Sequence, residues 1–297
     1  MRGAAVLLCA GILAATVSYA GAVLEARTPA HEGEQFVYVP DPRFLRIASL
    51  GYTGAVADML WFRTISYFGA HYRSDRLYPW LAKMCDVVTD LDPRALYVYR
   101  FAGVILPWEA KRPDDGIALL DKGIKNFPDS WLLYYLQGTN LYFFKDDVKR
   151  AASYLGRAAE LPGADPYAAR LAAAMYQQGF NPEAAESFLR QLASSTQDPT
   201  MQGVVQVRLK ELKIAHDTDA LEAAVRRYRT QTGKYPPSLQ VLVKAGVLDA
   251  IPAEPFGGRY TVDAATGAVG TTSGHLPLRL RESRARKEYQ KGNTVYW

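Results

Sequence analysis

The chain has 297 residues, of which 49% are hydrophobic, 12% aromatic and 22% charged, and this composition excludes both a disordered chain and a polytopic membrane protein. Two cysteines, Cys9 and Cys85, and four widely separated histidines offer no ligand set for a metal, so we expect no metal and no cofactor. The net charge is +5, but residues 279–291 carry six basic and two acidic side chains, so the body is close to neutral and we expect no nucleic-acid partner.

Residues 1–24 have the pattern of a signal anchor or of a cleavable signal peptide. No charged residue lies between Arg2 and Glu25, and residues 4–24 are apolar, small or weakly polar throughout. A helix of that length reaches about 30 Å, the thickness of the hydrocarbon core of a bilayer. The length favours an uncleaved single-pass anchor in the inner membrane, whereas small residues suit cleavage before Gly21. Both alternatives place the body in the periplasm.

Residues 25–43 form a polar linker that contains prolines, and a helical pattern follows over residues 44–215. Four prolines in that range each follow a run with the apolar spacing of an amphipathic helix. They are Pro93, Pro128, Pro162 and Pro199, at intervals of 35, 34 and 37 residues. A period near 34 with two helices per unit is typical of a helical solenoid, in which each helix pair buries its apolar face against its neighbours.

The best-defined unit covers residues 130–162, with Gly138 in its first helix. The small or apolar residues along its second helix are Ala151, Leu155 and Ala158. This pattern resembles the tetratricopeptide repeat (TPR), and residues 92–128 and 166–199 resemble it in part. The fold predicted for residues 44–215 is therefore mainly α, a TPR-like α-helical solenoid.

The TPR resemblance implies that the first helix of each repeat lines a concave surface. The positions that it assigns to this surface are rich in aromatic side chains, which are common anchors for bound polypeptides. These positions are Phe101, Ile105, Trp108, Tyr135, Thr139, Tyr142, Phe143, Tyr167 and Arg170. We predict that they form a groove for a partner polypeptide. The alternative is that the same rings pack in the core between helices.

A different pattern occupies residues 216–272. Asp217–Asp219 offers an N-cap for a helix that ends at Gly233, Ser238 offers one for a second short helix, and a hairpin is predicted around Asp263–Gly267. The order Tyr-Pro-Pro-Ser-Leu and then Pro-Phe-Gly-Gly resembles the periplasmic part of type II secretion pseudopilins and type IV pilin-like proteins. A pilin has its hydrophobic helix directly before this part, and here that segment lies far upstream. We therefore expect a small α+β module attached to the repeats.

Residues 273–297 form a basic tail. Its positive residues include Arg279, Arg281, Arg284, Arg286 and Lys287. One interpretation is a solvated tail or a terminal helix with ion pairs, and the other is a contact with anionic lipid headgroups or an acidic partner.

The sequence contains no phosphate-binding loop, serine-hydrolase elbow or zinc-protease motif. The pairs Asp114–Asp115 and Asp146–Asp147 fall at turns between paired helices, where acidic residues stabilise helix starts. We therefore expect no enzyme but a protein-binding scaffold or assembly factor of the bacterial cell envelope, with pilus or secretion components as the partners that the C-terminal resemblance implies. The alternative is a protein that binds or processes cell-wall or exopolysaccharide carbohydrate in the same groove.

Overall fold

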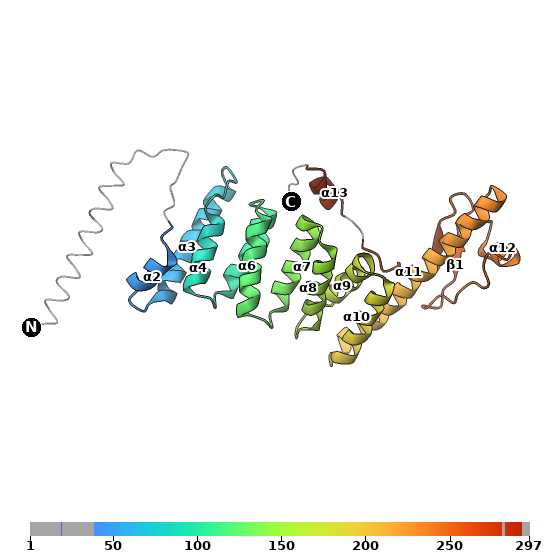
Figure 1. Cartoon of the computed structure of the whole chain (residues 1–297), viewed down its shortest axis with the longest axis horizontal. Coiled ribbons are helices and arrows are strands. Elements are labelled where there is room, and N and C mark those ends of the chain that lie inside the picture. The colour runs from blue at the N-terminus through green and yellow to red at the C-terminus, as the bar shows by residue number, and fades with distance from the viewer. Residues whose placement is uncertain (1–18, 20–38, 281–282, 293–297) are drawn as a thin grey trace, which may run out of the picture. The chain divides into compact units, whose positions relative to one another are not determined.

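The computed structural model describes residues 19, 39–280 and 283–292, and residues 41–297 form a unit by themselves (Figure 1). Outside the described residues lie all of the predicted anchor except Tyr19, residues 25–38 of the predicted linker, and residues 281, 282 and 293–297 of the predicted tail. Within the part that is described, no helix combines the length and the hydrophobicity needed to cross a bilayer.

The described chain is mainly helical, as predicted. Its helices are α2 (Pro42–Ala48), α3 (Thr53–Tyr72), α4 (Leu81–Leu91), α5 (Leu96–Trp108), α6 (Pro113–Asn126), α7 (Trp131–Lys145), α8 (Val148–Glu160), α9 (Pro166–Gly179), α10 (Pro182–Ser195), α11 (Pro199–Thr232), α12 (Leu239–Lys244) and α13 (Arg284–Gln290). Strands β1 (Tyr260–Val262) and β2 (Val269–Thr271) pair antiparallel, with Tyr260 opposite Thr271.

Prolines mark the ends of these helices, as predicted. Pro93, Pro128 and Pro162 lie in the turns that follow α4, α6 and α8. Pro199 is instead the first residue of α11, and the side chain of Asp198 accepts a hydrogen bond from the N–H of Thr200. Proline suits this position because it lacks an N–H that would otherwise be unpaired, and the aspartate satisfies one of the remaining donors.

Each helix packs mainly on the helices that precede and follow it in the chain. The antiparallel pairs are α3–α4, α5–α6, α7–α8 and α9–α10, and Figure 1 shows them side by side in sequence order. First helices of neighbouring pairs also meet, since α5 contacts α7 and α9 contacts α11. One surface of this unit is therefore built from the first helices of successive pairs.

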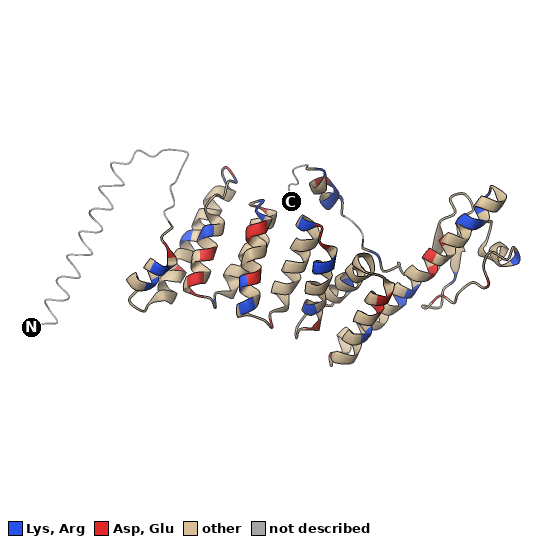
Figure 2. Cartoon of the chain, viewed as in Figure 1, with Lys and Arg blue, Asp and Glu red and all other residues tan. Residues whose placement is uncertain are grey.

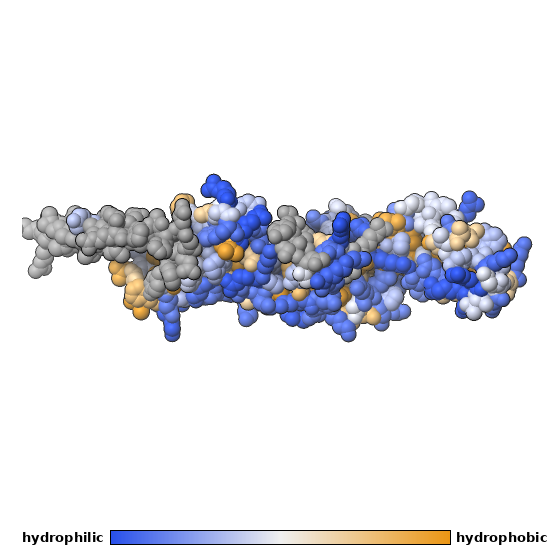
Figure 3. Space-filling model, turned by 90° about the horizontal axis from the view of Figure 1, so that it is seen from above, coloured by the Kyte–Doolittle hydropathy of each residue, from blue (hydrophilic) through white to orange (hydrophobic). Residues whose placement is uncertain are grey.

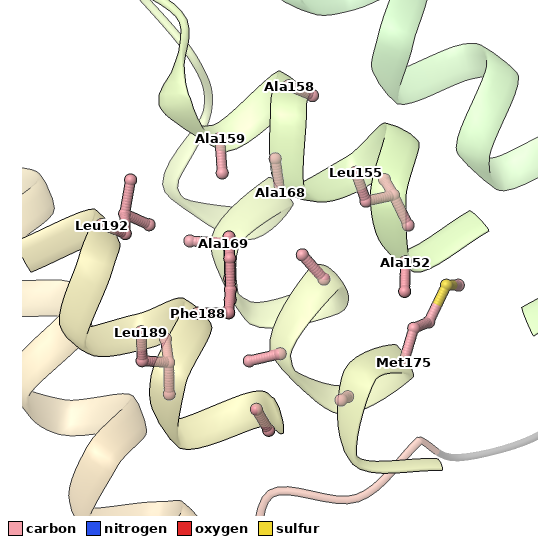
Figure 4. Packing of buried hydrophobic residues seen from close by; sticks show 14 of the residues in the cluster. Ala152, Leu155, Ala158, Ala159, Ala168, Ala169, Met175, Phe188, Leu189 and Leu192 are labelled. Carbon is pink, nitrogen blue, oxygen red and sulfur yellow. The ribbon is translucent and has the colours of Figure 1, made fainter. Parts of the chain in front are cut away.

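Small side chains fill the contact between α8 and α9 (Figure 4). The buried alanines of this cluster are Ala151, Ala152, Ala158, Ala159, Ala168, Ala169, Ala172, Ala173, Ala174 and Ala185. Larger side chains such as Leu155, Met175 and Phe188 fill the remaining space. Alanine loses no rotamer freedom on burial and favours the helix, so this face orders at little entropic cost and lets the helices approach closely.

Helix α11 continues without a break from the helix pairs into the C-terminal module, so the predicted helix start at Asp217–Asp219 is wrong. The predicted limit between residues 215 and 216 falls inside this helix. The carboxylate of Asp217 is buried and accepts hydrogen bonds from the Tyr260 hydroxyl and the Lys213 ammonium, each at 2.8 Å. It therefore serves tertiary contacts and does not cap a helix. The predicted helix end at Gly233, the short helix after Ser238 and the hairpin are confirmed.

Glu254 joins the loop before β1 to the last residue of β2 and to the segment that follows it. One carboxylate oxygen accepts the N–H groups of Phe256 (2.9 Å) and Gly258 (2.7 Å), and the other accepts the hydroxyls of Thr271 (3.1 Å) and Ser273 (2.6 Å). Burial alone raises the pKa of Glu254, but these hydrogen bonds outweigh it, and the pKa lies below its ordinary value.

Gly138 and Gly203 form a matched pair for testing the helix contacts. A Cβ at Gly138 would lie 2.6 Å from Cγ of Leu155 and 3.1 Å from the carbonyl oxygen of Ala151, whereas at Gly203 it would meet nothing within 4 Å. We expect Gly138→Ala to lower the free energy of unfolding by about 1–3 kcal/mol through overpacking. Gly203→Ala should raise it by up to about 1 kcal/mol because alanine favours the helix. Urea unfolding of both variants measures this, and a stabilised Gly138→Ala would contradict the close contact.

Glu254→Gln tests the hydrogen bonds of the module through pH. Because the folded pKa is lowered, the carboxylate stabilises the fold above the unfolded pKa of about 4.3, and this contribution is lost as the pH falls through the folded value. We expect the variant to be less stable than the parent at pH 7 and the difference to shrink below about pH 4. Urea unfolding at a series of pH values measures the difference, and a constant difference would show that the charge contributes nothing.

Candidate functional site

A groove with a volume of about 590 Å³ lies on the surface formed by α5, α7 and α9. Its lining residues are Val104 and Trp108 of α5; Tyr135, Leu136, Thr139, Tyr142 and Phe143 of α7; Tyr167, Arg170, Leu171 and Ala174 of α9; and Arg279, Leu280 and Ser283 from the C-terminal segment. Cavities of this size hold small ligands or a few side chains of a peptide. We refer to this site as the groove.

The groove collects most of the residues predicted for it. Seven of the nine predicted positions line it, and they come from the first helices of three successive pairs. The exceptions are Phe101 and Ile105 of α5. The ring of Phe101 packs edge-on against Trp61 and Phe68 of α3, with ring centroids 5.2 and 5.3 Å apart. The register of α5 therefore directs Phe101 toward α3, while Ile105 is half-buried outside the lining.

Hydrogen bonds from α7 fix the floor of the groove. The side chain of Asn140 is buried, accepts a hydrogen bond from Trp108 Nε1 at 3.1 Å and donates one to the carbonyl of Gly103 at 2.8 Å. Phe143 is also buried, with its ring centroid 4.5 Å from that of Trp108. The alternative that aromatic rings belong to the core therefore holds for Phe143, whereas Trp108 is only half-buried.

The accessible part of the groove is aromatic and positively charged. Tyr167 is 51% exposed and Tyr135 is half-buried. Burial raises the pKa of Tyr135, so its hydroxyl is protonated and can donate. Arg170 is exposed, and no described residue forms an ion pair or a hydrogen bond with it. Among the described lining residues there is no Asp or Glu, and Figure 2 shows α7 almost without charged residues.

The C-terminal segment forms one side of the groove. The N–H of Leu278 donates to the carbonyl of Glu211 at 3.1 Å, and the side chain of Leu278 is buried in the core between the helix pairs. Arg279 forms an ion pair with Asp219, and Leu280 and Ser283 then line the groove. A sequence pattern gives no local signal for these contacts, because they join residues far apart in the chain.

Helix α13 docks on the end of α7 through Arg286. This side chain is 3% exposed, forms an ion pair with Asp146, and stacks on the Tyr142 ring at 3.9 Å. It also donates to the carbonyl and the hydroxyl of Tyr142, both at 3.2 Å. The Tyr289 ring lies 5.2 Å from that of Phe144. Arg286 is therefore held by charge-assisted hydrogen bonds together with a cation–π contact.

The predicted basic tail thus divides into two groups. Arg279 and Arg286 form ion pairs with the body, which agrees with the interpretation of a terminal helix with ion pairs. Arg284 and Lys287 are exposed and leave the other interpretation open.

The other side chains that could act chemically have structural roles. Burial raises the pKa of the Cys85 thiol to about 12, so it is not a thiolate at neutral pH. Asp114 and Asp115 lie in the first turn of α6, and Asp147 caps α8, as predicted. The described residues contain no group of three potential metal ligands.

A second hollow of about 640 Å³ lies on the C-terminal module, where Arg229 stacks on Tyr235 at 4.4 Å.

Sequence reasoning missed half of the groove. Leu171 and Ala174 follow Tyr167 and Arg170 on the same face of α9 at helical spacing, so periodicity could have found them. Val104 could have been found in the same way from Trp108.

Arg286→Ala should release α13 from α7. Charge-assisted hydrogen bonds contribute about 1.5–3 kcal/mol, so we expect hydrogen exchange over residues 284–290 to accelerate at least about tenfold, while exchange in α8 and α9 stays as it was. Arg284→Ala, at an exposed position of the same helix, is the control and should leave exchange unchanged. Hydrogen-exchange mass spectrometry measures both, and equal exchange in the two variants would show that the guanidinium does not hold the helix.

Comparison with known proteins finds no relative of this chain. No family model, no curated protein and no solved structure matches the chain. The resemblances to tetratricopeptide repeats and to pilin-like modules therefore rest on the residue patterns given above, and the assignment of function rests on the groove.

Proposed function

We propose that this chain is a non-catalytic binding protein of the bacterial cell envelope, in which a TPR-like helical solenoid holds a segment of a partner polypeptide in the groove. The observation that carries the proposal is that seven residues chosen as groove positions of that family line a single cavity. Independent core residues on three helices would have no reason to converge on one hollow. In this proposal residues 4–24 anchor the chain to the inner membrane and the body lies in the periplasm.

The chemistry of the groove favours an apolar side chain next to a carboxylate as the ligand. Leu136 and Leu171 offer an apolar surface, and Tyr135 adds a hydroxyl donor at its edge. Arg170 is an exposed cation without a partner among the described residues, so an Asp or Glu of the ligand would be complementary to it. An extended or helical peptide can present both groups at once.

The C-terminal module supports the choice of partner class. Its helix, short second helix and hairpin follow the order seen in the pilin-like pattern, and pilus or secretion components are the partners that this resemblance implies. The module would then add a second contact beside the groove.

A carbohydrate is the second candidate ligand, because the ring of Tyr167 is 51% exposed and sugars stack on such faces. The groove offers few polar groups to the many hydroxyls of a sugar, since most of its lining is apolar or aromatic. Isothermal titration with cell-wall glycan fragments separates the candidates. Saturable binding that Tyr142→Ala abolishes would favour the carbohydrate.

Selection of displayed peptides on the purified full-length chain tests the proposal. We expect enrichment of peptides that place a large apolar side chain beside Asp or Glu. Arg170→Glu should weaken their binding at least about tenfold through charge reversal, and Tyr135→Ala should do so through loss of an aromatic anchor. Fluorescence anisotropy with the selected peptides measures the dissociation constants.

The matched control is Arg157→Glu, a charge reversal at an exposed arginine of α8, the second helix of its pair. This variant should bind the peptides as the parent does. Failure to enrich any motif, or equal binding by Arg170→Glu and Arg157→Glu, would contradict a peptide in the groove. Crosslinking in cells from a photoreactive residue at position 139 then identifies the protein that carries the motif.

A further inference from the structure

The first helix of the described unit exposes its apolar residues. α2 buries none of its residues, and Phe44 and Ile47 of this helix are 64% and 78% exposed. Leu50 and Tyr52, in the turn that follows, are exposed as well. Figure 3 shows hydrophobic residues gathered at this end of the described chain. Single exposed apolar residues are ordinary on a protein surface, but a contiguous group of this kind marks an interaction site.

Helix α3 continues the same apolar surface. Ala55, Met59, Phe62 and Ile65 are exposed and follow one another at intervals of four and three residues, so they form a stripe along one face. Met59 and Phe62 are 74% and 76% exposed. The opposite face is apolar as well, since Tyr67 is buried and Trp61 packs on α5. A helix that is hydrophobic on both sides is normally covered on both sides.

The position of this surface in the chain makes it unusual. In a repeat array the terminal helices have no further repeat to cover them, and a polar outer face keeps the array soluble. Here α2 and α3, the first helices of the described unit, expose apolar residues instead. The surface therefore implies an apolar environment that the described residues do not supply.

The charged residues beside the stripe are mostly basic. Arg63 of α3 is exposed, Arg43 of α2 is exposed and forms an ion pair with Asp41 at 3.1 Å, and Arg46 donates to the carbonyl of Asp90. The single acidic residue of α3, Asp58, accepts a hydrogen bond from the Tyr97 hydroxyl at 3.2 Å. Aromatic and aliphatic residues on one face with arginine beside them are the composition of a helix that lies in the headgroup region of a membrane.

We propose that the exposed face of α2 and α3 lies in the interfacial region of a phospholipid bilayer, with its apolar side chains among the upper acyl chains and its arginines at anionic headgroups. The apolar residues of this face are Phe44, Ile47, Leu50, Tyr52, Met59, Phe62 and Ile65. A second copy of the chain is the main competing occupant. Anionic headgroups are complementary to the exposed arginines of this face, and the test below distinguishes the two occupants.

A membrane that holds residues 4–24 would lie close to α2. Residues 4–24 are the proposed anchor, and only 25–41 separate them from α2, a length of at most about 60 Å when fully extended. A bilayer that holds the anchor would therefore be present at high effective concentration around α2 and α3. The affinity of the face itself does not depend on the anchor, so the two can be tested separately.

The test uses the full-length chain with a protease site placed in the linker, reconstituted into vesicles of phosphatidylcholine and phosphatidylglycerol. Cleavage after reconstitution cuts the body away from residues 4–24, and flotation shows whether the body stays with lipid. We expect the body to float with these vesicles and to float less in high salt or with phosphatidylcholine alone. The double variant Met59→Asp and Phe62→Asp should lower the partition coefficient at least about tenfold, because it removes two apolar side chains that the proposal places in the bilayer.

Phe180→Asp is the matched control, because Phe180 is an aromatic residue that is also exposed but lies at the end of α9. It should float as the parent does. All three substitutions are at exposed positions, so circular dichroism should show an unchanged fold. Release of the cleaved parent body from the vesicles, or flotation of the double variant equal to that of the parent, would overturn the proposal. A lipid-free dimer that the double variant abolishes in sedimentation would assign the face to a second copy and would overturn it too.

Discussion

Close approach of neighbouring helices through small side chains is the constraint on which the rest of this structure depends. The alanines of α8 and α9 and Gly138 of α7 let three consecutive helices pack with few bulky residues between them. The groove is built on the first helices of three pairs, so its width follows from the separation of those helices. A larger residue at one of these contacts changes the core and the distance between groove walls together.

The second determinant of the groove is the C-terminal segment, which supplies a wall that repeats alone would lack. Tyr142 faces the groove and at the same time accepts the hydrogen bonds and the cation–π contact of Arg286. Its position is thus fixed from the side of α13, and the shape of the groove depends on residues about 140 positions apart in the chain. The groove and the C-terminal segment are therefore parts of one arrangement.

The sequence could predict those features that repeat or that act locally. Prolines mark helix ends because proline cannot continue a helix. Tyr135, Thr139 and Tyr142 follow one another on α7 at intervals of four and three residues, so they must share a face. Phe101 could not be placed in the same way, since small rotations of α5 decide whether its ring meets α3 or the groove. The burial of Arg286 and Asp217 depends on partners more than 40 residues away, for which a local pattern carries no signal.

Helix α11 belongs to two hydrophobic cores at once. Leu212 packs in the core between the helix pairs and Ile214 in that of the C-terminal module, although only one residue separates them in a continuous helix. Because α11 is continuous at this point, no loop separates the two cores within it. Insertions near this point would rotate one core against the other by about 100° per added residue. The number of residues in the shared helix therefore fixes the angle between the two cores around its axis.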